Sequence, residues 1–487
     1  MIIVPVTGPD MPRALAQIAA SSRYADLFEL RIDLLTAPDL PRLIVSARKP
    51  VIATCRPARE GGAFVGPEPD RLAILQSAID GGAAMVDLEL DAWNEGRACL
   101  RASRRRIRWI ASHHELDRYP HLVKSLYRAL RRTGADIVKF AYVADDAWQI
   151  RAAMEFLGYA RTDRQRAVAI AMGEAGEASR ILYRVFGGWG TFAAPEDGNQ
   201  SAPGQLPASV MKKVFRSHVR TAKTKVFGLV GNPVSQSKGI YIHNPLYRKL
   251  GRDAVYCRFK ITDLARFMRV VAGRAQGFSV TSPHKRAMMK YLARVEPLAR
   301  SLGAVNSVVR RAGGYYGKNT DACGALDAIE QRLRVRGRVM VVIGAGGAAR
   351  AIGGEAARRG AKVYVVNRTT ARAQRLSRAL GLRWTTFDAL ASLRPEIIAN
   401  ATSAGMWPDI RTTPLEKFPA SVLLAFDAIY NPSMTRFLSD AAGRGIVTVS
   451  GVEMYAGQAV EQILLFTGKR PGLRDVKRLF LAATRAQ

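Results

Sequence analysis

Short apolar runs recur along the first 215 residues of the chain and alternate with segments of helical spacing. The runs are rich in β-branched residues, predict buried strands, and lie at residues 2–6, 27–32, 51–55, 85–90, 109–112, 137–142, 168–172 and 191–193. The segments between them include 72–79 and 122–130, where apolar residues recur at helical intervals. About eight alternations of strand and helix within some two hundred residues predict a (β/α)8 barrel, with a doubly wound sheet as the alternative.

Charged and polar residues follow the predicted barrel strands at their carboxyl ends, where barrel enzymes carry their active groups. They are Glu29, Arg31 and Asp33 on the second strand, Arg56 and Glu60 after the third, Asp87 and Glu89 on the fourth, and His113 and His114 on the fifth. The sequence therefore predicts an active site at this edge of the barrel.

Lys139 interrupts the otherwise apolar sixth strand, ADIVKFAYV. Its side chain points either into the barrel or onto the helix layer, and both places are unfavourable for a charged amine. Burial lowers the pKa of an amine and frees it to attack a ketone. The alternative is a structural lysine with a buried stem whose ammonium group reaches solvent.

A glycine-rich turn follows an apolar strand in the second half, within Val339–Arg350, which reads VMVVIGAGGAAR. Glycines at this turn let the backbone approach a pyrophosphate, and the N-terminus of the following helix attracts the anion. The predicted cofactor-binding residues of the loop are Gly344, Ala345, Gly346, Gly347 and Ala348.

The next apolar run, 362–366, ends at Asn367, Arg368 and Thr369, where a dinucleotide fold contacts the adenine ribose. An acidic residue there would accept a hydrogen bond from the 2′-hydroxyl of NAD. Instead, the guanidinium groups of Arg368 and Arg372 suit a 2′-phosphate. The sequence predicts NADP(H) rather than NAD as the cofactor.

Length and composition limit the remaining choices. A chain of 487 residues is expected to form two to four domains, at about 150 residues each. No apolar run reaches the roughly 18 residues that span a bilayer, and no secretion signal is recognisable, so a cytoplasmic protein is expected. The four cysteines lie far apart without a CxxC pair, and no metal site is expected.

The net charge of +34 results from 74 Lys and Arg against 40 Asp and Glu. Such a field attracts polyanions, which makes nucleic acid a partner to consider. However, the basic residues are spread along the chain, and the densest run, Arg101–Arg108, has only Trp109 as an aromatic neighbour. We interpret the charge as a solvated surface that favours anionic small substrates, and expect no specific binding of nucleic acid.

Five motifs of the first half resemble type I 3-dehydroquinate dehydratases in sequence and in order: ELRID, TCRPAREGG, SHHE, ADIVK and SAPGQ. The resemblance implies that Lys139 forms a Schiff base with the substrate ketone. It also implies that His114 removes the neighbouring proton and helps water leave, with Glu60 orienting the imidazole. The family motif Ser-x-His selects His114 over His113, and period-2 alternation agrees that only one of them faces the interior.

The same resemblance implies further residues that hold the substrate hydroxyls and carboxylate. They are Glu29, Arg31, Arg56 and Arg180, together with Ser201 and Gln205 of a loop that closes over the ligand. Pro5 stands where many members of the family have a serine that touches the substrate, so one contact departs from the pattern.

The second half resembles shikimate dehydrogenase from about Lys225 to the end, through GNPVSQSKG, FSVTSPHK, GAVNSV and GKNTDACG. By their chemistry, Lys285 and Asp321 could pass a proton to a carbonyl oxygen as hydride arrives, with a surface ion pair as the alternative. The resemblance implies that they form the catalytic couple. It further implies substrate contacts from Ser237, Thr281, Asn306, Asn319, Tyr430 and Gln458, and places Asn400–Met406, Gly451 and Met454 near the cofactor.

Gly239 departs from the SKS triplet of this family, because the chain reads Ser237-Lys238-Gly239. One of two serines that hold the substrate carboxylate is missing, and such a contact is worth roughly 1.5 to 3 kcal/mol. The preference could therefore shift from shikimate towards quinate, although Thr281 is retained.

The order of the two halves resembles the bifunctional enzymes of the shikimate pathway, which would convert 3-dehydroquinate to 3-dehydroshikimate and reduce it with NADPH to shikimate. The predicted domains are a barrel at 1–218, a linker at 219–225, a substrate lobe at 226–330 with 450–487, and a Rossmann NADP domain at 331–449. The alternatives are an NAD-dependent dehydrogenase of quinate and a non-catalytic regulator with the same folds. The sequence predicts no oligomeric state.

Overall fold

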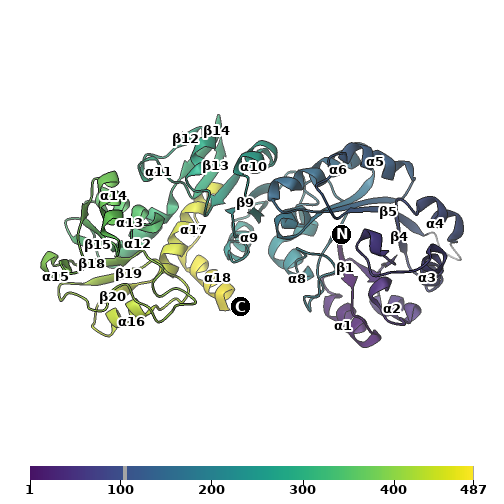
Figure 1. The fold of residues 1–487 in the computed structure, drawn as a ribbon, viewed down its shortest axis with the longest axis horizontal. Helices are drawn as coiled ribbons and strands as arrows, with labels where there is room; N and C mark the ends of the chain where they lie inside the picture. The colour runs from purple at the N-terminus through teal and green to yellow at the C-terminus, as the bar shows by residue number, and fades with distance from the viewer. Residues whose placement is uncertain (102–106, 486–487) are drawn as a thin grey trace. The chain divides into compact units, whose positions relative to one another are not determined.

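The computed structural model describes residues 1–101 and 107–485 (Figure 1). Most of the basic run Arg101–Arg108 lies outside the described residues. The chain divides into two compact units, Met1–Ile240 with Asp253–Ala275, and Tyr241–Arg252 with Gln276–Gln487. The domain boundaries predicted from the sequence stay a prediction.

Eight parallel strands of the first unit form the predicted barrel, in the order β7-β6-β5-β4-β3-β2-β1-β8. They are β1 (Ile2–Val6), β2 (Leu27–Arg31), β3 (Val51–Thr54), β4 (Met85–Glu89), β5 (Arg108–Glu115), β6 (Ile137–Val143), β7 (Arg166–Met172) and β8 (Thr191–Phe192). Helices surround the strands (Figure 1): α1 (Met11–Ser21), α2 (Leu40–Ala47), α3 (Glu68–Asp80), α4 (Trp93–Cys99), α5 (Val123–Arg132), α6 (Arg151–Thr162) and α7 (Glu177–Ile181). The barrel is confirmed and the doubly wound sheet is not.

Strand β5 is longer than the apolar run 109–112 predicted. Its polar end, Ser112–Glu115, continues the ladder with β6, where Ser112 pairs with Lys139 and His114 with Ala141. A prediction from apolar residues alone ends this strand too early. The residues that complete the strand are polar and do not belong to the apolar core.

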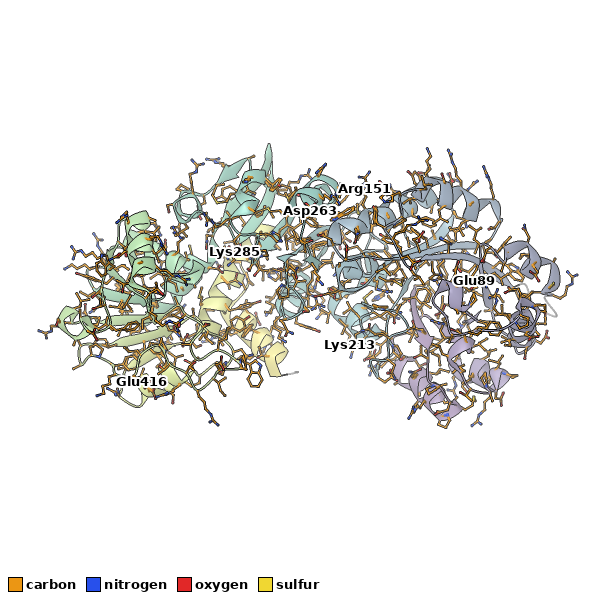
Figure 2. The ribbon with its side chains drawn as sticks, viewed as in Figure 1. Glu89, Arg151, Lys213, Asp263, Lys285 and Glu416 are labelled. Carbon is orange, nitrogen blue, oxygen red and sulfur yellow. The ribbon has the colours of Figure 1, made fainter. Side chains whose placement is uncertain are left out.

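On β2, β4, β5 and β6 the barrel interior changes from apolar to polar within two residues. Leu27, Met85, Ile110 and Ile137 belong to one buried apolar cluster at the amino ends of the strands. Because side chains alternate, the residues two positions later face the same interior. These are Glu29, Asp87, Ser112 and Lys139, all buried, and Glu89 (Figure 2) continues the row on β4. The apolar layer thus forms the floor of a polar layer.

The first unit also contains the segment that follows the barrel. It comprises α8 (Ala208–Val210), a π-helical turn at Met211–Phe215, and the parallel pair β9 (Lys225–Gly231) and β10 (Ala254–Lys260). The short helix α10 (Leu264–Val270) follows β10, and α9 (Gly239–Lys249) lies between the two strands in sequence.

The second unit contains a mixed ladder and a parallel sheet. The ladder has β11 (Gly277–Val280), β13 (Ser307–Arg311), β14 (Gly314–Lys318) and β12 (Arg294–Val295), next in sequence to α11 (Pro297–Leu302) and α12 (Thr320–Glu330). The parallel sheet has the order β17-β16-β15-β18-β19-β20. Its strands are β15 (Val339–Ile343), β16 (Lys362–Val366), β17 (Arg383–Trp384), β18 (Ile397–Asn400), β19 (Leu424–Asp427) and β20 (Val447–Val449).

The helices of the parallel sheet are α13 (Gly347–Arg358), α14 (Thr370–Leu380), α15 (Leu390–Leu393) and α16 (Arg436–Ala442). This strand order reverses between β15 and β18, which is where open α/β sheets bind their ligands. The predicted strand-turn-helix around the glycine-rich loop is confirmed, with β15 ending at Ile343 and α13 beginning at Gly347.

Two helices of the second unit, α12 and α17 (Gly451–Thr467), pack against each other through glycines (Figure 1). A Cβ on Gly324 would lie 2.6 Å from the backbone nitrogen of Gln458, and a Cβ on Gly457 would lie 3.1 Å from the Cα of Gly324. The backbones therefore approach too closely for any side chain. The last helix, α18 (Leu473–Arg485), follows α17.

None of the helices within residues 1–101 and 107–485 combines the length and apolar character that a bilayer crossing requires.

Candidate active sites

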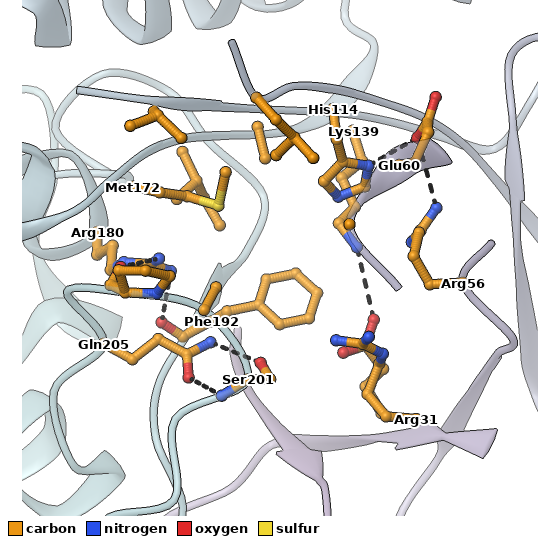
Figure 3. Close-up of a pocket in the computed structure, with 18 residues that line it drawn as sticks. Arg31, Arg56, Glu60, His114, Lys139, Met172, Arg180, Phe192, Ser201 and Gln205 are labelled. Carbon is orange, nitrogen blue, oxygen red and sulfur yellow. Dashed lines mark hydrogen bonds and ion pairs between the residues drawn. The ribbon is translucent and has the colours of Figure 1, made fainter. Parts of the chain in front are cut away.

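A cavity of about 300 Å³ opens in the barrel above the apolar floor (Figure 3). All nine site residues predicted for the first half line it: Glu29, Arg31, Arg56, Glu60, His114, Lys139, Arg180, Ser201 and Gln205. Leu116, Met172 and Phe192 add apolar walls. The cavity thus combines many charged groups with an enclosed shape, as a site for a small polar anion requires.

Lys139 points into the barrel and not onto the helix layer, which were the two orientations that the sequence left open. Its amine lies 2.9 Å from Asp87 Oδ2 and 3.5 Å from Glu29 Oε1, and 4.5 Å from the centre of the Phe192 ring. The side chain is only 7% exposed, so the alternative of an ammonium group in solvent is wrong. The carboxylates give the amine a fixed position in the cavity.

His114 shares its carboxylate with the neighbouring histidine. Glu60 Oε2 lies 2.8 Å from His114 Nδ1, and Glu60 Oε1 lies 3.5 Å from His113 Nδ1. Only His114 lines the cavity, as the alternation of the strand predicted. Burial lowers the pKa of His114 to about 3, so its imidazole is neutral at pH 7 and free to accept a proton.

The histidine pair also lowers the pKa of Glu60 to about 2 against the opposing effect of its burial. Glu60 is therefore ionised, and its carboxylate orients the imidazole through Nδ1, which leaves Nε2 for a reacting group. Figure 3 shows Glu60 between His114 and Arg56.

A chain of alternating charges extends from Arg56 of the cavity wall, and the sequence gave no individual role to its other members, Asp87, Glu89 and Arg71. Arg56 contacts Asp87 at 2.9 Å and Glu89 at 2.5 Å, and Arg71 Nη1 lies 2.7 Å from Glu89 Oε2. Arg71 is fully buried although it comes from helix α3. Arg71 directly precedes the predicted helical segment 72–79, and no pattern in the sequence indicated its burial. Each charge has an opposite neighbour, which offsets its desolvation.

Arg180 is buried at 1% exposure, and no acidic partner of it occurs within the described residues. Two of its nitrogens donate to the carbonyls of Phe192 and Pro203, and Nε has no hydrogen-bond partner. Burial lowers the pKa of its guanidinium to about 9. Such a group is costly in an empty cavity and suited to an incoming anion.

The loop of Ser201 and Gln205 is held by its own contacts. Gln205 Nε2 donates to Ser201 Oγ at 3.0 Å, and the N–H of Ser201 donates to Gln205 Oε1 at 3.0 Å. Gly204 has a φ of +77° and packs against the carbonyl of Gly173, which leaves no room for a side chain. Figure 3 shows Gln205 and Arg180 across the cavity from His114.

Lys285 and Asp321 meet in the second unit, where Lys285 Nζ donates to Asp321 Oδ2 at 2.7 Å. Asp321 lies in the first turn of α12, capped by Asn319, and Lys285 follows β11 by five residues. Their side chains remain 38% and 22% exposed, so both can reach a ligand. The expected pairing is therefore present, and the ion pair alone does not distinguish catalysis from surface chemistry.

The other predicted contacts of the second unit differ in exposure. Asn306 is buried, and its Oδ1 accepts from the N–H of Thr320 at 2.8 Å. Gln462, which the sequence analysis missed, accepts from Ser279 Oγ at 2.7 Å and donates to Ser307 Oγ at 2.8 Å. Its signal was only its place one turn after Gln458. Thr281 and Gln458 are partly exposed. Tyr430 is 47% exposed, and its ring contacts that of Phe480.

The predicted cofactor loop has the free backbone that a phosphate requires. Gly346 caps α13 without a side-chain hydrogen bond, and the first turn of the helix has no acidic residue. A Cβ on Gly346 or Gly347 would meet nothing within 4 Å, whereas Gly344 has a φ of +121° and packs on the carbonyl of Ala401. Ala345 and Ala348 complete the turn. The loop therefore fits a dinucleotide pyrophosphate at the N-terminus of α13.

The ribose end of the loop is basic and accessible. Arg368 and Arg372 are exposed, and Asn367 Nδ2 donates to the carbonyl of Thr369 at 3.0 Å, which fixes the turn that presents them. Gly451 packs so closely on the carbonyl of Ile429 that this position excludes any side chain. The packing requires glycine here independently of any contact with a cofactor. The arginines fit a 2′-phosphate.

Comparison with known proteins decides the family. The model of type I 3-dehydroquinase matches residues 2–220, and the shikimate dehydrogenase substrate binding domain matches residues 229–308. The bifunctional 3-dehydroquinate dehydratase/shikimate dehydrogenase of Arabidopsis thaliana is 34% identical over 497 residues, which cover 96% of this chain and 82% of that protein. The chain belongs to this bifunctional family.

Other relatives cover the second half of this dehydratase/dehydrogenase. The shikimate dehydrogenase (NADP(+)) of Shouchella clausii is 35% identical over 273 residues, with 53% of this chain and 98% of that protein covered. A crystal structure of a shikimate dehydrogenase in complex with NADP+ superposes with a TM-score of 0.50 at 32% identity, over 54% of this chain and 96% of the other. The Rossmann fold and the NADP cofactor thus apply to the second half.

Both departures from the family motifs have a structural setting. Pro5 is buried in β1 opposite Glu29 and is absent from the lining of the cavity. A Cβ on Gly239 would lie 3.0 Å from the Tyr256 ring and 3.3 Å from Ser237 Oγ, so the tyrosine fills the space of the missing serine. The N–H of Gly239 donates to Ser237 Oγ at 3.2 Å.

Within residues 1–101 and 107–485, no group of three or more His, Cys, Asp and Glu side chains is placed to hold a metal ion.

Proposed function

We propose that this chain dehydrates 3-dehydroquinate to 3-dehydroshikimate in its barrel and reduces the product to shikimate with NADPH in its second half. Membership of the bifunctional family supports both steps. The single observation that supports the assignment most is the cavity that joins Lys139, His114 and Arg180 in one enclosure. The roles given below to individual residues belong to the proposal.

In the dehydratase step, the amine of Lys139 attacks the ketone carbon, and water leaves as the Schiff base forms. The cationic imine withdraws electrons from the adjacent carbon. The neutral His114 then removes a proton from that carbon and afterwards delivers a proton to the departing hydroxyl group. Arg180 holds the substrate carboxylate, and hydrolysis of the imine restores the amine.

In the reductase step, NADPH supplies a hydride to the carbonyl carbon when it is bound. Lys285 donates a proton to the carbonyl oxygen, and Asp321 holds the ammonium group and receives a proton in the reverse direction. The loop at Gly346 and the N-terminus of α13 hold the pyrophosphate, while Arg368 and Arg372 hold the 2′-phosphate.

Purified protein with 3-dehydroquinate and NADPH tests the proposal. With 3-dehydroquinate alone we expect enone absorbance to rise, and on addition of NADPH we expect the enone and NADPH absorbances to fall together as shikimate forms. Absence of turnover at both steps would favour a non-catalytic regulator with these folds.

Quinate oxidation with NAD is a second candidate for the second half, because Gly239 and Tyr256 replace the serine pocket of the family motif. We keep shikimate first since the ribose end of the loop carries Arg368. The ratio of kcat/KM for shikimate with NADP to that for quinate with NAD decides between them, and a ratio below one would favour quinate.

The location and the partners stay predictions. A cytoplasmic location is proposed from the sequence, while the name of the Arabidopsis relative places that protein in the chloroplast. Binding of 3-dehydroquinate and shikimate is proposed without a specific nucleic acid partner, and salt-dependent retention on heparin with no sequence preference would agree with this.

A further inference from the structure

Arg258 on strand β10 joins two segments that carry predicted substrate contacts of different reactions. Its Nε and Nη2 donate to the two carboxylate oxygens of Glu177 at 3.0 and 2.5 Å. Its Nη1 donates to the carbonyl oxygen of Ser235 at 2.8 Å. All three residues belong to the first compact unit. One rigid guanidinium plane therefore fixes both segments relative to each other.

The Glu177 end of this bridge belongs to the dehydratase. Glu177 begins α7, a helix of only five residues, and Arg180 follows one turn later. The side chains of Glu177 and Arg258 are 7% and 13% exposed. Burial raises the pKa of Glu177 and Arg258 opposes this effect. Removal of either partner leaves a buried polar group unpaired at the base of the helix that presents Arg180.

The Ser235 end of the bridge belongs to the dehydrogenase. Ser235 is exposed and lies two residues before Ser237, in a turn closed by the hydrogen bond from the N–H of Ser237 to the carbonyl of Val234 at 3.1 Å. A surface turn has few contacts of its own, so a bond from a half-buried arginine to its backbone limits its motion.

We propose that Arg258 is a positioning residue shared by the two substrate sites, which aligns Arg180 in the barrel and the Ser237 turn of the dehydrogenase half. This inference rests on the proposed function, because it takes Arg180 and Ser237 as substrate contacts. Arg258 itself contacts neither substrate in this account. Its effect on both reactions passes through Glu177 and Ser235.

Other contacts keep β10 on the barrel when the bridge is removed. Asp146 Oδ2 accepts from the N–H and Oγ1 of Thr262 at 2.8 and 2.6 Å and from the N–H of Asp263 (Figure 2) at 2.8 Å. Lys260 lies 3.1 Å from Glu174. Variants of Arg258 are therefore expected to fold, and Lys260 provides a matched control on the same strand and the same barrel loop.

The test measures kcat and KM for both reactions in the full chain with Arg258→Met, Arg258→Lys, Glu177→Gln and the control Lys260→Met. Arg258→Met is expected to raise KM for 3-dehydroquinate and for shikimate about tenfold, with kcat within about threefold and KM for NADP unchanged. Arg258→Lys retains one contact of the fork and is expected to lie between the wild type and Arg258→Met. Lys260→Met is expected to stay within about twofold of the wild type at both sites.

Glu177→Gln is the most specific test, because the substitution lies in the barrel and the measured effect is on the KM of the dehydrogenase for shikimate. It should raise KM for shikimate in the same direction as Arg258→Met, and it keeps the test open if Arg258→Met does not fold. A normal KM for shikimate in Glu177→Gln overturns the shared role, as does an equal effect from Lys260→Met. A wild type inactive in both assays overturns the proposed function instead, so the two failures are distinguishable.

Discussion

The two candidate sites treat charge in opposite ways. In the barrel, Lys139, Asp87 and Glu89 are withdrawn from water and paired with one another or with arginines. In the second unit, the side chains of Lys285 and Asp321 keep 38% and 22% of their exposure. A pair of the second kind contributes at most about 1 kcal/mol, whereas loss of one partner from a buried pair costs several.

This difference matches the proposed chemistry. An amine that bonds to carbon must be held in one place and kept from competing reactions, which an enclosed network of charges provides. A pair that passes protons to an oxygen must exchange them with solvent between turnovers, which partial exposure allows. Sites of similar composition thus differ in rigidity because their reactions require it.

The largest expected effect separates the two sites completely. Lys139→Ala should abolish dehydration, since no other amine is within reach of the cavity among its lining residues, and leave the reduction of supplied 3-dehydroshikimate intact. Borohydride with substrate should trap an adduct on Lys139 of the wild type, as measured by peptide mass spectrometry. An untrapped wild type refutes the imine mechanism.

Arg180→Met is expected to raise KM for 3-dehydroquinate by about a hundred- to a thousandfold, because the substrate carboxylate loses its charged partner. The same variant should unfold at higher denaturant concentration than the wild type, because an unpaired buried charge is removed. Steady-state kinetics and urea unfolding measure both effects. Lower stability together with unchanged KM would contradict the assignment.

Arg368→Ala tests the exposed, solvent-accessible counterpart of Arg180. NADPH should bind about ten- to a hundredfold more weakly, since a charge-assisted contact to the 2′-phosphate is lost, while NADH binding stays nearly constant. Titration of cofactor fluorescence measures both. Equal weakening of the two cofactors would show that the arginine does not contact the 2′-phosphate.

The last expected effect is a loss of stability in acid that depends on His114. The pKa of His114 is about 3 in the folded protein because of burial, and about 6.5 in an unfolded chain. The unfolded state therefore binds more protons between these values, so stability falls as the pH decreases through this window. Glutamine in place of His114 should reduce the slope by up to about 1.4 kcal/mol per pH unit between pH 6 and 4.

Urea unfolding at several pH values measures this slope. His113 is a suitable control, because Glu60 raises its pKa and its protonation acts in the opposite direction. His113→Gln should leave the acid loss intact or steepen it. An unchanged slope in His114→Gln would mean that the buried imidazole is not the group that titrates.

The sequence allowed the architecture to be predicted wherever apolar periodicity and motif chemistry agreed. The strand before Gly344 and the one after α13 have the predicted bounds, because their interiors are apolar and glycine marks the turn. Lys139 was singled out for the same reason, since a charge within an apolar strand is conspicuous.

The pattern failed where polar side chains complete buried structure. The end of β5, the buried Arg71 of α3 and the buried Gln462 of α17 are satisfied by partners distant in sequence, which no local pattern contains. Tyr256, which fills the space beside Gly239, was missed because its position depends on the pairing of β9 with β10.

The glycine crossing of α12 and α17 sets a limit on engineering of the second site. Asp321 lies in the first turn of α12, about one turn before Gly324, whose backbone rests on that of α17. Even a methyl group at Gly324 or Gly457 would push the helices apart and carry the carboxylate with them. Engineering for new substrates should therefore spare these two glycines. Varying the partly exposed Thr281 and the exposed Tyr430 instead keeps the aspartate in place.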